Sequence, residues 1–76
     1  MTVLSQEGQL DLAHSEFKRR GCSAEILDIE LFPVSGGSFY CSTVTALVDG
    51  IRAVGRSEPC IGAGKALLQA VERACS

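Results

Sequence analysis

The dipeptide Asp49-Gly50 constrains the fold of this chain more than any other feature, because it separates two segments rich in β-branched residues. A tight type I′ hairpin turn needs a positive φ angle at both central residues, and Asp-Gly is one of the few pairs that tolerates this. The flanking segments, residues 39–49 and 51–57, alternate in side-chain character as strands do. The sequence therefore predicts an antiparallel hairpin in the middle of the domain.

Alternation also predicts which side chains share a face of this hairpin. In residues 39–49, the side chains of Val44, Ala46 and Val48 share one face, and those of Thr43, Thr45 and Leu47 share the other. In residues 51–57, the side chains of Ile51 and Ala53 point to one side, and those of Arg52 and Arg56 point to the other. One side of the hairpin is thus apolar, and the other carries hydroxyl and charged groups.

A further strand is predicted before the hairpin, over residues 24–34. Its apolar residues Leu27, Ile29 and Leu31 alternate with Asp28 and Glu30, which is typical of a half-buried strand. Pro33 and the Gly-rich run at 35–38 end it. The three strands would form an antiparallel meander over residues 24–57.

Two helices are predicted at the ends of the chain, over residues 5–20 and 60–75. In the first, Leu10, Ala13 and Phe17 recur on one stripe with Leu12 beside it, and Gly21 ends the helix. The second has a broad apolar stripe at helical spacing, made of Ala63, Ala66, Leu67, Ala70, Val71 and Ala74. Its alanines would let this helix lie close to a sheet.

These elements predict a two-layer α+β domain of order helix–three-stranded antiparallel meander–helix (α-β-β-β-α), a single domain over residues 1–76. Both helices would cover the same face of the sheet. A chain of 76 residues buries roughly 60% of the surface that its unfolded form exposes, so its stability margin is thin. The opposite face, with Thr43, Thr45, Phe39 and Cys41, is only partly polar, so we expect a homodimer that uses this face or the edge of the sheet.

Charge and hydropathy exclude several classes of function. Seven Lys and Arg against nine Asp and Glu give a net charge of −2, whereas binding to nucleic acid through phosphates normally requires an excess of basic residues. No apolar run approaches the ~18 residues of a membrane span. The N-terminus shows no signal-peptide pattern, so we expect a cytoplasmic protein that does not enter the membrane.

The four cysteines, Cys22, Cys41, Cys60 and Cys75, lie far apart in the sequence, and His14 is the only histidine. Structural zinc sites usually take ligands in close pairs, and no such pair occurs here. In a short secreted chain the same count would indicate two disulfides. Without a secretion signal we expect reduced thiols that pack as small hydrophobic groups, with no disulfide and no bound metal.

No catalytic site is predicted. A cysteine nucleophile would need a nearby base, and His14 lies beside the apolar stripe of the first helix, where packing at the edge of the core or exposure to water explains it. Asp28 and Glu30 share a strand face as an acid–base pair would, but alternating charges on the wet face of a strand explain them more simply. We expect a protein that is not an enzyme and uses no cofactor.

The Gly-rich start of the second helix is the candidate ligand site. Unpaired backbone N–H groups and the positive end of the helix dipole favour an anion at such a position. The residues that would hold it are Ser57, Ile61, Gly62, Ala63, Gly64 and Lys65. The alternative is that Gly62 and Gly64 serve only to allow close packing of the helix against the sheet.

Two families resemble this pattern. Residues 39–50 and 55–57, followed by an Ala-rich helix, look like the second half of a double-stranded RNA-binding domain. That family contacts phosphates with a cluster of lysines at the start of its last helix. The matching stretch here, residues 60–65, carries Lys65 alone, so the topology can be shared without the function.

The other resemblance covers about residues 25–74. The motifs are Leu-Asp-Ile at 27–29, Val-Ser-Gly-Gly at 34–37, Val-Thr-Ala-Leu-Val-Asp-Gly at 44–50, Val-Gly-Arg-Ser at 54–57 and Ile-Gly-Ala-Gly-Lys-Ala-Leu at 61–67. They resemble the βββα units of the C-terminal regulatory domain of alpha-isopropylmalate and citramalate synthases. The turn at 58–62 departs from that family's pattern, and the chain has no room for its catalytic barrel.

The synthase resemblance implies a regulatory and dimerisation module that stands alone without an enzyme. In that family two such units pack together, and an amino or keto acid lies near the loop before the helix. A single unit would therefore pair with a second copy of itself and bind a small carboxylate. A module that binds nucleic acid in the manner of a double-stranded RNA-binding domain is the alternative.

Overall fold

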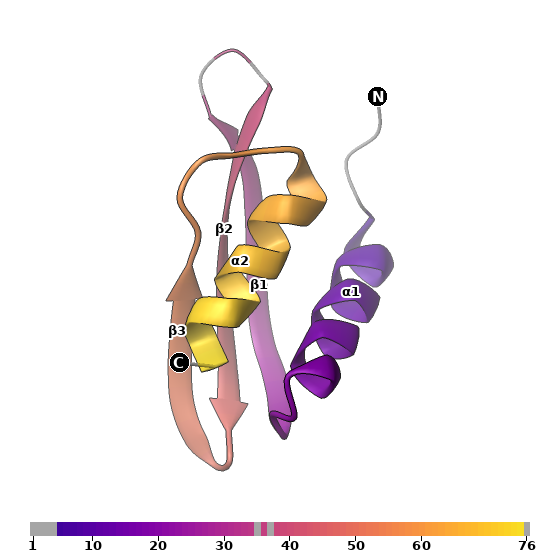
Figure 1. Cartoon of the computed structure of the whole chain (residues 1–76), viewed down its shortest axis with the longest axis vertical. Helices are drawn as coiled ribbons and strands as arrows, with labels where there is room; N and C mark the ends of the chain where they lie inside the picture. The colour runs from indigo at the N-terminus through magenta and orange to yellow at the C-terminus, as the bar shows by residue number, and fades with distance from the viewer. Residues whose placement is uncertain (1–4, 35, 37, 76) are drawn as a thin grey trace.

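The computed structural model describes residues 5–34, 36 and 38–75, and it has the expected α-β-β-β-α order (Figure 1). Its elements are α1 (Gln6–Arg19), β1 (Ala24–Val34), β2 (Phe39–Val48), β3 (Ile51–Arg56), β4 (Cys60–Ile61) and α2 (Ala63–Cys75). This arrangement confirms the α+β class. Ser35 and Gly37 of the expected turn after the first strand lie outside the described residues.

The sheet is antiparallel in the order β1-β2-β3, and β4 pairs with β2. Asp49 has a φ angle of 55° and Gly50 one of 81°, so the expected hairpin turn forms between β2 and β3. The register places Ala46 opposite Ala53 and Thr45 opposite Val54. The predicted faces of the hairpin are therefore confirmed.

The expected alternation in β1 is wrong at its first apolar residue. A bulge between Ile26 and Asp28 interrupts the register with β2, and Leu27 is 49% exposed. Ile26, Ile29 and Leu31 point toward the helices instead, since their β2 partners or neighbours lie on that side. Leu27 is the extra residue of this bulge, so the side chains before and after it do not follow the strict alternation of a regular strand.

The second helix begins three residues later than its sequence pattern indicates. Cys60 and Ile61 pair with Tyr40 and Phe39 as β4, and Gly62 has a φ angle of 94°, which the right-handed helix cannot contain. The physical reason is that β2 extends beyond β3, whose pairing stops at Thr43. The short strand β4 supplies partners to the part of β2 that β3 does not reach.

Helix α1 has a defined start and end. The Ser5 hydroxyl accepts a hydrogen bond of 3.0 Å from the Gly8 N–H, and Gly21 follows the helix with a φ angle of 74°. Ala13 and Phe17 are buried as expected, but Leu10 is 41% exposed. Leu10 lies over a shallow hollow between α1 and β1, whereas Leu12 packs against the core.

Both helices lie on one face of the sheet (Figure 1). The main core joins α1, β2 and α2 through Ala13, Phe17, Val44, Ala46, Leu67, Ala70, Val71 and Ala74. A second cluster consists of Tyr40, Ala63 and Ala66. Every residue of the predicted α2 stripe is buried. The stripe of this helix is thus confirmed in full.

At Gly55, strand β3 closely approaches the backbone of α2. A Cβ atom at this position would overlap the carbonyl oxygen of Ala70 and the backbone nitrogen of Ala74. Gly62 and Gly64, which the sequence suggested for this role, do not fill it. No atom lies within 4 Å of a Cβ at Gly62, and a Cβ at Gly64 would sit 3.8 Å from Leu12 Cδ2, an ordinary contact.

Gly55→Ala should therefore destabilise the domain severely, by about 3 kcal/mol, because the clash is with backbone atoms that cannot rotate away. Gly64→Ala is the matched control: it lies within α2 with space for a methyl group, and we expect it to stabilise the helix by up to about 1 kcal/mol. Urea unfolding of both variants measures the two changes. Equal stability of the Gly55→Ala variant and the parent chain would contradict the close approach.

Candidate functional site

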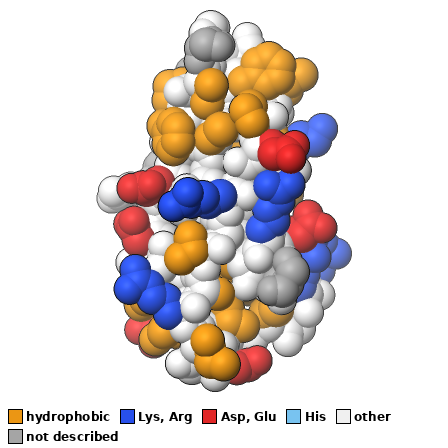
Figure 2. Space-filling view, turned by 90° about the vertical axis from the view of Figure 1, so that its left-hand side faces the viewer, with side chains coloured by type: hydrophobic (Ala, Val, Ile, Leu, Met, Phe, Trp, Pro, Cys, Tyr) orange, Lys and Arg blue, Asp and Glu red, His pale blue; other side chains and the backbone are white. Residues whose placement is uncertain are grey.

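The face of the sheet that the helices leave uncovered carries an apolar cluster at one end. We call it the apolar end, and it consists of Phe32, Val34, Phe39, Cys41 and Ile61. The register puts Phe32 opposite Cys41, and Phe39 opposite both Val34 and Ile61, so all five side chains share this face. Figure 2 shows hydrophobic side chains gathered at this end of the molecule, near the β1–β2 hairpin.

Three of these side chains are large and open to solvent. Phe32 is 46% exposed, Phe39 41% and Ile61 69%. Singly exposed apolar side chains are ordinary, but a contiguous group marks a surface that contacts another molecule. The apolar end is therefore a candidate interaction surface.

Charge is divided across the rest of this face, with acidic residues on β1 and arginines on β3. Glu30, Thr43 and Arg56 form one row across the three strands. Glu25, Leu47 and Arg52 form another. Opposite charges thus lie on opposite sides of β2, separated by a strand that carries no charge on this face.

The residues of the predicted ligand site fall into different surroundings. Ser57 is bound to β2: its hydroxyl accepts a 2.9 Å hydrogen bond from the Ser42 N–H, and its own N–H donates to the Ser42 carbonyl at 2.9 Å. Ile61 lies on the uncovered face of the sheet, within the apolar end. These two residues therefore belong to the sheet rather than to the start of α2.

The other four residues lie at the beginning of α2. Gly62 immediately precedes the helix, and its carbonyl accepts the Ala66 N–H at 3.3 Å. Ala63 is buried beside Tyr40, and Gly64 is near Leu12. Lys65 is exposed and lines a hollow between the two helices. Of the predicted site residues, only Lys65 contributes a charged side chain to a cavity.

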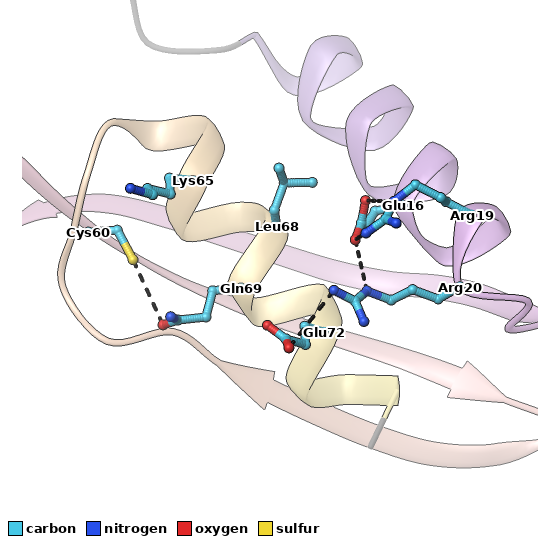
Figure 3. Close-up of a pocket in the computed structure, with 8 residues that line it drawn as sticks. All are labelled: Glu16, Arg19, Arg20, Cys60, Lys65, Leu68, Gln69 and Glu72. Carbon is cyan, nitrogen blue, oxygen red and sulfur yellow. Dashed lines mark hydrogen bonds and ion pairs between the residues drawn. The ribbon is translucent and has the colours of Figure 1, made fainter.

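Charged side chains from α1, the residue after it and α2 line that hollow (Figure 3). The buried Glu16 carboxylate accepts hydrogen bonds from Arg19 at 2.6 and 3.0 Å and from Arg20 at 2.8 Å. Arg20 also reaches Glu72 of α2 at 3.9 Å. Glu16 therefore orients both arginines on the α1 side of the hollow, whereas Lys65 extends from the first turn of α2 away from α1 (Figure 3).

Gln69 of α2, which also lines this hollow, is hydrogen-bonded to the segment before α2. Its side-chain oxygen accepts a hydrogen bond of 2.7 Å from the Glu58 N–H and one from the Cys60 thiol at 3.8 Å. Arg73 adds a hydrogen bond to the Arg56 carbonyl at 3.0 Å. The loop from β3 to β4 is thus fastened to α2 by side chains.

Sequence reasoning identified part of the uncovered face but not its full extent. It named Phe39, Cys41, Thr43 and Thr45, whereas Phe32 joins the face through its pairing with Cys41. The opposed rows of glutamate and arginine also follow from the register alone. Strand alternation with a known register would have found these residues, but the bulge in β1 shifts the alternation of that strand.

The part of the chain that the structure describes offers no group of three or more His, Cys, Asp or Glu residues that could hold a metal ion. None of its helices is long and apolar enough to cross a membrane. No protein-family model matches the sequence, and neither a curated protein nor a solved structure gives a significant match.

Hydrogen bonds from Arg19 lower the pKa of Glu16 below its usual value of 4.5, since they favour the ionised carboxylate. A carboxylate whose pKa is lower in the folded state than in the unfolded state stabilises the fold at every pH above its unfolded pKa. This stabilisation is lost as the pH falls below 4.5. Glu16→Gln should thus lower the melting temperature at pH 7 and lower it less at acid pH.

Thermal unfolding followed by circular dichroism between neutral and acid pH measures this difference. Asp11→Asn is the control, because it removes an exposed carboxylate from the same helix. A Glu16→Gln penalty that stays constant as the pH falls through the acid range would show that charge does not cause it.

Proposed function

We propose that this chain is a non-enzymatic, cytoplasmic module that acts by forming a homodimer through the uncovered face of its sheet. The observation that carries the proposal is the self-complementarity of this face. It has an apolar end, an acidic side on β1 and a basic side on β3. A surface that pairs with a copy of itself about a twofold axis needs this property.

The distribution of charge selects the direction of the twofold axis. Rotation about an axis parallel to β2 exchanges the two sides of the sheet and leaves positions along the strand unchanged. The two apolar ends then lie over each other, and β3 of each copy lies over β1 of its partner. Arg56 faces the partner's Glu30, and Arg52 faces the partner's Glu25, because each pair shares a register row.

An axis perpendicular to the strands gives a poorer contact. It would place β1 over β1 and therefore bring acidic rows together, while each apolar end would lie over the charged part of its partner. Like charges that face each other across an interface are costly. Aligned packing with nearly parallel β2 strands is thus the arrangement that satisfies both the apolar and the charged groups.

The size of the domain supports the same proposal. A chain of 76 residues has a small core, and its largest fully buried side chains number only a few, led by Phe17 and Leu67. Burial of Phe32, Phe39 and Ile61 between two copies would add an apolar contact that one copy cannot make alone. Dimerisation would therefore stabilise the fold as well as the assembly.

The resemblance to the regulatory domain of alpha-isopropylmalate and citramalate synthases agrees with such a module, since two units of that domain pack together. It also suggests a small carboxylate, an amino or keto acid, as ligand. Lys65, Arg19 and Arg20 line the hollow between the helices together with Glu16 and Glu72, which leaves one positive charge in excess to attract an anion. We propose this hollow, reached from the start of α2, as the place where the carboxylate binds.

The dimer is tested by reversing one charge of the proposed pair. Arg56→Glu should raise the dimer dissociation constant by roughly tenfold, because the pair occurs twice about the twofold axis and each change replaces attraction by repulsion. The double variant Arg56→Glu with Glu30→Arg should recover the affinity. Sedimentation equilibrium measures each dissociation constant, and Lys18→Glu makes the same charge change on the exposed surface of α1.

Ile61→Glu extends the test to the apolar end and should produce a monomer, since it places a charge within the apolar contact. If the parent chain is monomeric at high micromolar concentration, the dimer proposal is wrong. A dimer that persists in Arg56→Glu, or that the double variant does not recover, would contradict the proposed axis.

The carboxylate is tested separately by thermal shift with branched-chain amino acids and 2-oxo acids. A ligand at a hundred times its dissociation constant stabilises the folded state by about 2.7 kcal/mol, which raises the melting temperature by several degrees. Lys65→Gln should abolish that rise, whereas Lys18→Gln should keep it. The absence of any rise with the parent chain would exclude the carboxylate and leave the dimer proposal intact.

A further inference from the structure

Two cysteines that are distant in the sequence meet at the end of the molecule opposite the apolar end. Cys22 follows α1 and leads into β1, and Cys75 is the last residue of α2. Both are half-buried and pack against the main core. The side chains of Cys22 and Cys75 line one surface hollow together with Arg20 and Glu72.

We propose that Cys22 and Cys75 form a redox site, which a low-molecular-weight disulfide converts reversibly into an intramolecular disulfide. The site does not depend on the dimer face, because its residues lie at the other end of the domain (Figure 1). It is open to small molecules because the two thiols line a hollow on the surface. Cys75 is the last residue of α2, and Cys22 lies in the segment between α1 and β1. A disulfide between them requires their Cα atoms to lie within about 7 Å of each other.

The reaction is two successive thiol–disulfide exchanges. Cys22 first releases its proton to water, and its thiolate then attacks one sulfur of the small disulfide. The Cys22–sulfur bond forms, the disulfide bond breaks, and the first small thiolate leaves and takes up a proton from water. The Cys75 sulfur then attacks Cys22 Sγ, the mixed disulfide breaks, and the second small thiolate leaves with the Cys75 proton. Two protein thiols are oxidised, and one small disulfide is reduced to two thiols.

The surroundings of Cys75 set the order of these steps. Burial, followed by the hydrogen bond with Cys22, raises the pKa of the Cys75 thiol to about 12, so it keeps its proton at neutral pH. The thiolate is the attacking species, so we place the resolving step, rather than the first attack, at Cys75. Once Cys22 is in the mixed disulfide, Cys75 resolves the intermediate.

The other two cysteines are placed differently. Cys41 lies on the uncovered face of the sheet, opposite Phe32. Cys60 belongs to β4, and its thiol donates to the Glu58 carbonyl at 3.2 Å. They provide internal controls in the same chain.

The disulfide would tie the end of α2 to the junction of α1 and β1. It closes a loop that contains the whole sheet and nearly all of α2. A cross-link that closes a long loop restricts the unfolded chain strongly, so oxidation should raise the melting temperature by about 10 °C or more.

The experiment uses the parent chain and the double variant Cys41→Ser with Cys60→Ser, each incubated with oxidised glutathione. Peptide mapping without reductant should find Cys22 joined to Cys75 with the loss of two hydrogen atoms. The melting temperature should rise with the bond and return to its starting value with dithiothreitol. In Cys75→Ser, which lacks the resolving thiol, a glutathione adduct should accumulate on Cys22.

Three results would overturn the proposal. They are stable glutathione adducts on Cys22 in the parent chain without an intramolecular bond, a Cys22–Cys75 bond that forms only between two chains, and a bond that leaves the melting temperature unchanged. If the double variant does not fold, the peptide map and melting curve of the parent chain decide the question alone.

Discussion

The contact between Gly55 and the backbone of α2 is the constraint on which the rest of this structure depends. Helix α2 lies so close to β3 that a methyl group at position 55 would overlap the peptide units of Ala70 and Ala74. The close approach is possible because the buried stripe of α2 consists mostly of alanines. Leu67 and Val71 supply most of the apolar volume of that stripe, and the alanines set the distance.

This docking also fixes the loop that precedes α2. Because the helix lies along β2 and β3, Gln69 and Arg73 reach the segment after β3 and bind Glu58 and the Arg56 carbonyl. The chain is thereby led back to β2, where Cys60 and Ile61 form β4. Ile61 joins the apolar end only as a result of that return. The proposed dimer surface is therefore completed by the same packing that builds the core.

The proposed functions are separated in space. The apolar end lies beside the β1–β2 hairpin, whereas the α1–β1 junction, which carries Cys22, and the end of α2, which carries Cys75, lie toward the other end (Figure 1). There the Asp49 N–H donates a hydrogen bond to the Ser23 carbonyl. Between the two ends, Glu16 gathers Arg19 and Arg20 on the wall of the hollow between the helices.

The sequence by itself determined the order of the elements, the turn at Asp49-Gly50, the faces of β2 and β3, and the buried stripe of α2. These features depend on backbone preferences and on periodicity, which are set within a few residues. Only the tertiary structure decided the bulge that exposes Leu27, the strand β4, the contact at Gly55, the rows of Glu30 with Arg56, and the meeting of Cys22 with Cys75. Each of these joins segments that are distant in the chain, and strand register and helix docking are selected by the packing of the whole domain rather than by local sequence.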